Sequence, residues 1–198
     1  MTATGWAWLA AAGVLALVDW IAVAQGARHS SHSSLCAEAF FFRPAASLPD
    51  RRFLLGGSGW NDKPTPANIH RLGHVGTGLH NSFNCSCLAV LNVARDSMAS
   101  MGFSPATRVF EAAGAGTCLI TDAWEGIELF LQPDTEVLVA RDGADVVEHL
   151  AALTPDRART IGAAARARIL AGHTYAQRAI EVDRLLRKAL TRTHEMAV

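Results

Sequence analysis

The sequence predicts an α/β domain built on a Rossmann-like open parallel sheet, with helices on both faces. Short apolar stretches alternate with helical segments from residue 52 onward, and Gly-rich loops follow several of them. Parallel strands need crossover connections, which helices usually supply, so this alternation favours a parallel sheet. We expect the domain to span residues 44–190, with an atypical N-terminal segment at 1–43 and a tail at 191–198.

Five stretches have the length and composition of buried strands. Each is short, largely apolar and bounded by Gly or polar residues. The predicted strands are 52–56, 69–72, 88–93, 117–121 and 136–140.

Helix start and stop signals mark the segments between the strands. For the helix predicted over 105–115, Ser104 is the expected N-cap, Pro105 the first helical residue, and Gly116 lies just past the end. Thr154 precedes a Pro in the same way at the start of a helix over 155–170. The other predicted helices are 78–84, 126–131, 145–153 and 174–190.

An apolar run from Trp6 to Ala24 precedes these elements, and Asp19 is its one charged residue. Its length approaches the ~20 residues that span a bilayer. No Lys or Arg precedes it, so it lacks the basic start of a signal peptide. We expect an apolar helix here, with three interpretations open: a membrane anchor over residues 6–24, a buried Ala-rich helix, or an N-terminus that is not the natural one.

Composition disfavours several classes of function. Lys and Arg number 18 and so do Asp and Glu, so no basic surface indicates a nucleic-acid partner. The four cysteines lack zinc-type spacing, because Cys85 and Cys87 are too close together, although His74 and His80 are near in sequence. We therefore expect no metal, reduced thiols and a cytoplasmic location.

Two loops beyond the predicted strands carry candidate ligand-binding residues, since ligands of open α/β sheets bind beyond the carboxyl ends of strands. The first N–H groups of the helix at 105–115 lie at its positive end without helical partners, which favours a phosphate. Ser104, Thr107 and Arg108 add hydroxyl and guanidinium donors there, and Arg95 follows the preceding strand.

Glu111 lies further along the same helix, where its carboxylate could accept from the vicinal hydroxyls of a ribose. A surface Glu on an amphipathic helix is the alternative interpretation. In the next loop, Gly126 would allow close approach of a diphosphate or sugar, and Trp124 could either pack on the domain or face the ligand. The glycines of 56–59 lack the full G-x-G-x-x-G pattern, which disfavours nicotinamide binding.

Residues 44–186 resemble the C-terminal domain of group 1 glycosyltransferases with the GT-B fold, and most closely the spore-maturation-protein-like branch. Together the matching stretches are specific, although no single one is. They are 52–60, 72–76, 89–95, 102–116, 120–122, 136–139, 161–166 and 173–175.

The resemblance implies a domain that binds a nucleoside-diphosphate sugar, without an obligatory metal or other cofactor, for transfer to a hydroxyl of a glycan, lipid or protein acceptor. It implies that Glu111 binds the donor ribose and that Ser104, Thr107 and Arg108 surround the diphosphate and sugar. Trp124, Gly126 and Ile127 would line the donor site.

Two departures from this family stand out. Phe103 occupies a position where many group 1 transferases carry a second Glu that faces the donor sugar. The chain also resembles only the second of two domains, and the likeness begins near Pro44, so we expect the first strand of this domain to be missing and the enzyme to be incomplete. A non-catalytic nucleotide-binding module, anchored or not, or a remnant of a longer enzyme, is the alternative.

Overall fold

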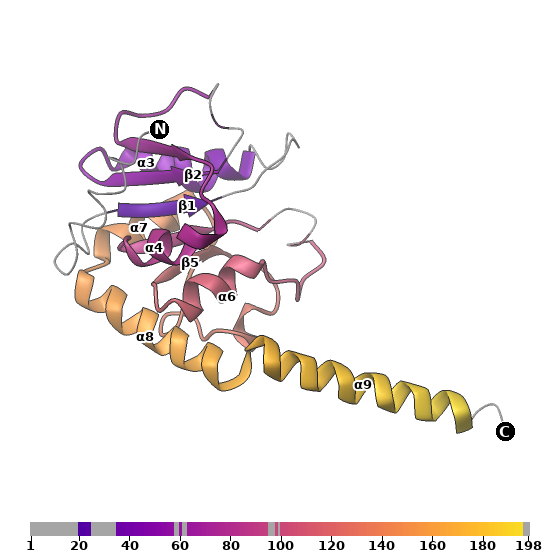
Figure 1. Ribbon diagram of the computed structural model, residues 1–198. Coiled ribbons are helices and arrows are strands. Elements are labelled where there is room, and N and C mark those ends of the chain that lie inside the picture. Colours follow the sequence, from indigo (N-terminus) through magenta and orange to yellow (C-terminus); the bar gives the residue numbers. More distant parts are fainter. Residues whose placement is uncertain are drawn as a thin grey trace.

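The computed structural model describes residues 20–24, 35–57, 60, 63–94, 98 and 100–195. They form a six-stranded sheet in the order β3-β2-β1-β4-β5-β6 (Figure 1). All neighbouring strands pair in parallel, which confirms the predicted open parallel sheet. The strands are β1 (Trp20–Ala24), β2 (Arg52–Gly56), β3 (Ile69–Gly73), β4 (Ala89–Asn92), β5 (Leu119–Asp122) and β6 (Leu138–Ala140).

Strand β1 lies in the middle of the sheet, where we expected no strand. Trp20 pairs with Arg52 of β2, and on the other side Ile21 pairs with Ala89 of β4. The predictions of an apolar helix over Trp20–Ala24 and of a missing first strand are therefore wrong, and the sheet includes residues that precede 44. A strand flanked on both sides in a parallel sheet is continuously apolar, so its sequence does not differ in pattern from a buried helix. Residues 6–19 of the expected helix lie outside the described residues.

Helices cover both faces of the sheet (Figure 1). In β2, Phe53 and Leu55 point into one apolar core, with η1 and α7, whereas Leu54 points into the other, with α4 and α6. The helical segments are η1 (Glu38–Phe42), α3 (Arg43–Ser47), η2 (Thr77–Leu79), α4 (His80–Cys85), α6 (Thr107–Gly114), η3 (Ile127–Leu129), α7 (Gly143–Ala152), α8 (Pro155–Gly172) and α9 (Tyr175–Glu195).

Helix α8 contributes to both cores. Its start is as predicted, with Pro155 in the first turn and the Thr154 hydroxyl accepting from the N–H of Arg157. Its first half places Ile161 in the core shared with α7, and its second half places Ile169 in the core shared with α6. The helix thus passes from one face of the sheet to the other and leads the chain to the α6 side.

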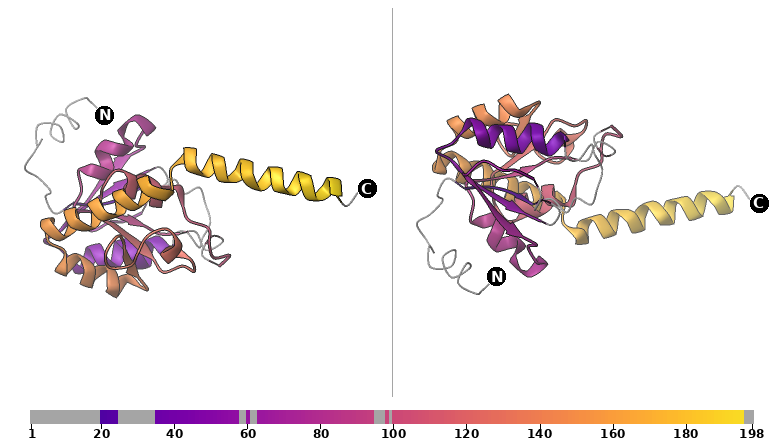
Figure 2. Two further views of the ribbon diagram at one scale, coloured as in Figure 1. Left: turned by 90° about the horizontal axis from the view of Figure 1, so that it is seen from below. Right: turned by 90° about the horizontal axis from the view of Figure 1, so that it is seen from above.

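Helix α9 projects away from the rest of the molecule (Figure 2). Its side chains are almost all exposed over 175–191, including a stripe at helical spacing that contains Tyr175, Val182, Leu186 and Leu190. The predicted helix over 174–190 is confirmed. In the described part of the chain, no helix is both long enough and apolar enough to cross a membrane.

Candidate functional site

Buried polar side chains join the carboxyl ends of β4 and β5. One carboxylate oxygen of Asp122 accepts from the N–H of Ala94 at 2.9 Å and from the hydroxyl of Thr121 at 3.2 Å. That hydroxyl in turn accepts from the side-chain amide of Asn92 at 3.1 Å. All four residues are buried. The network fixes the direction in which the chain leaves β4, toward the loop that precedes α6.

The two loops that follow β4 and β5 are in contact. The N–H of Phe103 donates to the carbonyl oxygen of Glu125 at 2.7 Å. A Cβ atom built at Gly126 would lie 2.4 Å from Cδ1 of the Phe103 ring, so only glycine fits there beside that ring. Phe103 has a φ of 50°, which is rare for a bulky residue and needs support from its surroundings. The contact with 125–126 is part of that support.

Helix α6 begins two residues later than predicted. Thr107 is its first residue, Ala106 is its N-cap with extended backbone, and no side chain caps it. Ser104 is half-buried and lies before the helix, so its predicted role as N-cap is wrong. The extended backbone of Ala106 keeps the helix from beginning before Thr107. The first N–H groups of α6 are thus left without a side-chain cap.

Arg108 follows in the first turn of α6 and is half-buried. Burial lowers the pKa of its guanidinium, and the nearby carboxylate of Glu111 opposes that shift. The group stays charged at neutral pH, because an arginine titrates far above it. Within the described residues, Arg108 makes no hydrogen bond or ion pair. A half-buried cation with so few partners favours an anionic ligand.

Glu111 lies further along α6, with its side chain 45% exposed. Its Oε2 atom is 4.0 Å from Nδ1 of His80, the first residue of α4. The other ring nitrogen of His80, Nε2, lies 3.2 Å from the carbonyl oxygen of Val75. Sequence reasoning considered His80 only as a neighbour of a conceivable metal site. Its place beside Glu111 depends on the packing of α4 on α6, for which the sequence carries no local signal.

Trp124 and Ile127 belong to the core rather than to an open surface. Both are buried in the cluster shared with α6, and the Trp124 ring centroid is 6.0 Å from that of Phe130. Trp124 thus packs on the domain, which answers the question that its sequence left open. Both side chains anchor the loop after β5 to the core. Gly126, between them in sequence, has a φ of 96°. Arg95 lies outside the described residues.

The glycines after β2 have structural reasons of their own. A Cβ atom at Gly56 would lie 2.9 Å from Cγ2 of Val75. Gly57 has a φ of 114° and its N–H donates to the carbonyl of Gly73 at 2.7 Å. The remaining part of the 56–59 loop lies outside the described residues. Packing therefore accounts for these two glycines without a phosphate.

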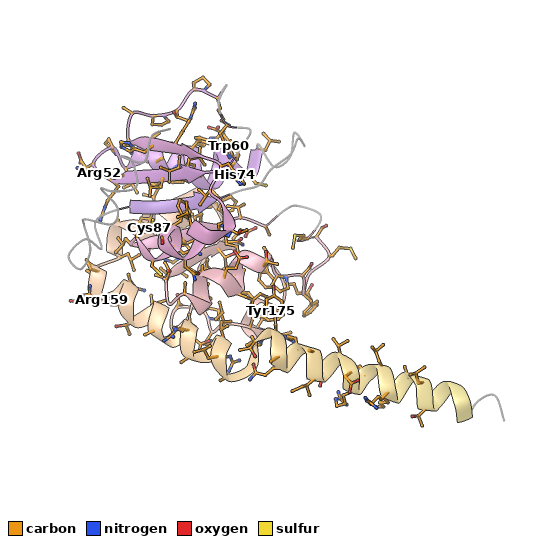
Figure 3. All side chains as sticks on the ribbon, viewed as in Figure 1. Arg52, Trp60, His74, Cys87, Arg159 and Tyr175 are labelled. Carbon is orange, nitrogen blue, oxygen red and sulfur yellow. The ribbon has the colours of Figure 1, made fainter. Side chains whose placement is uncertain are left out.

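The cysteines near α4 differ in their surroundings. Cys87 lies just beyond the end of α4 (Figure 3), and burial raises the pKa of its thiol to about 12. The exposed Cys85 donates to the carbonyl of Ala115 at 3.6 Å. Over the ranges that the structure describes, no three His, Cys, Asp or Glu side chains are grouped so as to hold a metal ion.

A known protein family and several solved structures resemble this chain. The model of a family described as glycosyl transferase-like matches residues 28–184. Sucrose-phosphate synthase from Thermosynechococcus elongatus is similar in structure, with a TM-score of 0.66 and 18% identity over 94% of this chain. Anabaena Alr3699/HepE in complex with UDP-glucose has a TM-score of 0.61 and 11% identity over 88% of the chain.

A glycosyltransferase involved in avilamycin A biosynthesis has a TM-score of 0.54 and 21% identity over 89% of the chain. At these identities the likeness shows the fold alone. The chain covers 49%, 49% and 54% of these three structures, so it spans about half of their length. The comparison with curated proteins found no match.

Proposed function

The chain belongs to the glycosyl transferase-like family, and we propose that it binds a nucleoside-diphosphate sugar as the donor for glycosyl transfer to a hydroxyl acceptor. One observation carries the proposal. The uncapped start of α6, the half-buried Arg108 and the carboxylate of Glu111 follow one another on a helix at the carboxyl end of the sheet. This is the edge where open α/β sheets bind ligands.

The diphosphate and the ribose of such a donor each have a chemical counterpart at this edge of the sheet. The diphosphate is an anion, which the amides at the start of α6 and the guanidinium of Arg108 can bind. The ribose carries two neighbouring hydroxyls, and the carboxylate of Glu111 can accept hydrogen bonds from them. Thr107 and Ser104 add hydroxyls near the same turn. The space beside Gly126 is taken by the ring of Phe103.

The same groups fit the chemistry of transfer. The bond between the anomeric carbon and the diphosphate oxygen breaks, and the acceptor oxygen forms a new bond to that carbon as its hydroxyl loses a proton. Negative charge grows on the departing diphosphate. Donors held in place before the reaction stabilise such charge most effectively, which is the role we give to Arg108 and the α6 amides. No metal or other cofactor is part of this proposal.

The family branch, the compartment and the acceptor are proposed from separate observations. The matching stretches between residues 52 and 175, taken together, favour the spore-maturation-protein-like branch, and we propose a role in the synthesis of cell-surface or spore-coat glycans. Four free cysteines favour a reducing, cytoplasmic compartment. Since the chain spans about half of the similar structures, we propose that acceptor binding involves a further domain or partner, and the acceptor itself is a glycan, lipid or protein hydroxyl.

Binding of UDP and UDP-glucose, measured by calorimetry, tests the proposal, because similar structures include a UDP-glucose complex. Charge-assisted hydrogen bonds are worth about 1.5–3 kcal/mol, so Arg108→Met should weaken binding about 10- to 100-fold. Glu111→Gln should also weaken it. The matched controls are Arg159→Met on the exposed side of α8 (Figure 3) and Glu148→Gln on α7, and both should bind as the wild type does.

Two outcomes separate the alternatives. Absence of nucleotide binding by the wild type, or equal affinity in Arg108→Met and Glu111→Gln, would contradict donor binding at this site. Because acceptor binding is proposed to need a further domain or partner, release of UDP from UDP-glucose by this chain alone would favour the transferase over the non-catalytic module.

A further inference from the structure

We propose that His80 is a second residue that binds the hydroxyls of the donor ribose, with its Nδ1 atom accepting from one hydroxyl while Glu111 accepts from the other. This inference rests on the proposed function. It adds a residue from α4 to a predicted site whose residues come from α6 and from the loops that follow β4 and β5.

The hydrogen bond at Nε2 assigns the tautomer of His80. The carbonyl oxygen of Val75, 3.2 Å away, can only accept, so Nε2 must carry the hydrogen. In the neutral ring, Nδ1 then bears a free lone pair and is an acceptor. The same contact anchors the ring, because it fixes one edge of the imidazole to the backbone and turns the opposite edge toward α6.

The free edge of His80 faces another acceptor. Nδ1 lies 4.0 Å from Oε2 of Glu111, which is beyond hydrogen-bond distance, and a neutral imidazole nitrogen and a carboxylate oxygen have no hydrogen to share. Two acceptors at this separation both need donors from elsewhere. Neighbouring hydroxyls of one ligand supply two such donors, each at about 2.5–3.0 Å from its acceptor.

Both side chains are accessible to a ligand. The side chain of His80 is 33% exposed and that of Glu111 is 45% exposed. They come from helices that pack on each other, so their separation is set by the fold rather than by a mobile loop. Arg108 lies one turn before Glu111 on the same helix, which places the pair beside the group that we assign to the diphosphate.

The test compares UDP with 2′-deoxy-UDP and 3′-deoxy-UDP, bound to the wild type and to His80→Phe. One neutral hydrogen bond corresponds to about a three- to tenfold change in affinity. The wild type should prefer UDP over the deoxy analogues, and His80→Phe should lose about three- to tenfold of this preference against one of them. His149→Phe is the matched control, because His149 makes the same kind of ring bond, to the Val139 carbonyl at 2.9 Å, from α7.

The three nucleotides together separate a ligand contact from a purely structural role. A change that only disturbs the fold of α4 should weaken binding of UDP and of both deoxy analogues equally, whereas loss of a hydroxyl contact changes the preference among them.

An unchanged hydroxyl preference in His80→Phe, or an equal loss of affinity for all three nucleotides, would overturn the inference while leaving the proposed function intact. A wild type that does not bind UDP would overturn both.

Discussion

The aromatic ring of Phe103 lies against the backbone of Gly126, in a space that a β-carbon on residue 126 would fill. Both residues have positive φ values, 50° and 96°, and they belong to loops that follow different strands. The ring is nevertheless 56% exposed, so it covers the glycine on one side and presents apolar surface on the other. The loop that follows β4 therefore presents an aromatic side chain held by a strained backbone.

Gly126→Ala should destabilise the protein and weaken donor binding. The added Cβ would lie 2.4 Å from the Phe103 ring, and the φ of 96° is unfavourable for any L residue. Overpacking and backbone strain each cost on the order of 1–3 kcal/mol. Urea denaturation and UDP calorimetry measure the two effects.

Two further variants test the cause. The control Gly78→Ala places its Cβ in open space without a positive φ and should behave as the wild type. Combining Phe103→Ala with Gly126→Ala should restore part of the stability, because the clash is gone while the backbone strain remains. Additive losses in the double variant would show that the ring contact is not the cause.

Asp122→Ala should lower the free energy of unfolding by about 1–3 kcal/mol, because it leaves the buried N–H of Ala94 without its acceptor. Asp122→Asn keeps an oxygen in that place and should cost less. Urea denaturation of both variants, with the exposed Asp50→Ala as control, measures the difference. Equal losses in Asp122→Ala and Asp50→Ala would mean that the network at the strand ends contributes nothing to stability.

Stability should decrease at acid pH through His173, at the junction of α8 and α9. Its ring lies 5.6 Å from that of Phe130, and its Nδ1 accepts from Arg178 at 2.7 Å. Burial, followed by the charges of Arg178 and Arg168, lowers the pKa of His173. The folded state then binds fewer protons than the unfolded state, so this contribution is fully present above an unfolded pKa of about 6.5 and is lost as pH falls below it.

Denaturation at about pH 7.5 and about pH 5.5, on either side of the histidine titration, measures this loss. The wild type should lose more stability between the two conditions than His173→Phe, whose ring cannot take up a proton. An equal loss in the wild type and His173→Phe would assign the dependence to other groups.

Local signals in the sequence were sufficient for much of the fold. The strand predicted over 52–56 is β2, residue for residue. Gly116 ends α6 as expected: its φ is 79°, and the N–H of Thr117 reaches back to the carbonyl of Ala112 at 3.1 Å. Thr154 caps α8. Each of these features depends on a few residues that are neighbours in the sequence, so the local sequence pattern is enough to predict it.

Other features depend on partners that are distant in sequence. Trp20–Ala24 is a strand because β2 and β4 lie on either side of it, and a continuous apolar run does not reveal this. Ser is a residue type common at N-caps, yet Ala106 is extended and the helix starts only at Thr107, three residues after Ser104. His80 gains its place in the candidate site only when α4 packs on α6.

Gly162→Ala should destabilise the protein although the substitution lies within a helix. In a helix interior, Ala is ordinarily more stable than Gly by roughly 0.5–1 kcal/mol. Here the added Cβ would lie 2.1 Å from the carbonyl oxygen of Gly116, which is backbone and cannot swing aside. Moving α8 away from this turn would open the core around it, at a cost of about 1–3 kcal/mol.

Gly172→Ala is the matched control, because it lies in the same helix with nothing within 4 Å of its added Cβ. Thermal and urea denaturation should show a loss for Gly162→Ala and no loss for Gly172→Ala. UDP binding should weaken in the former as well, since the Gly116 turn ends the helix that carries Arg108 and Glu111. A gain in stability for Gly162→Ala would show that α8 packs less closely on that turn than the structure has it.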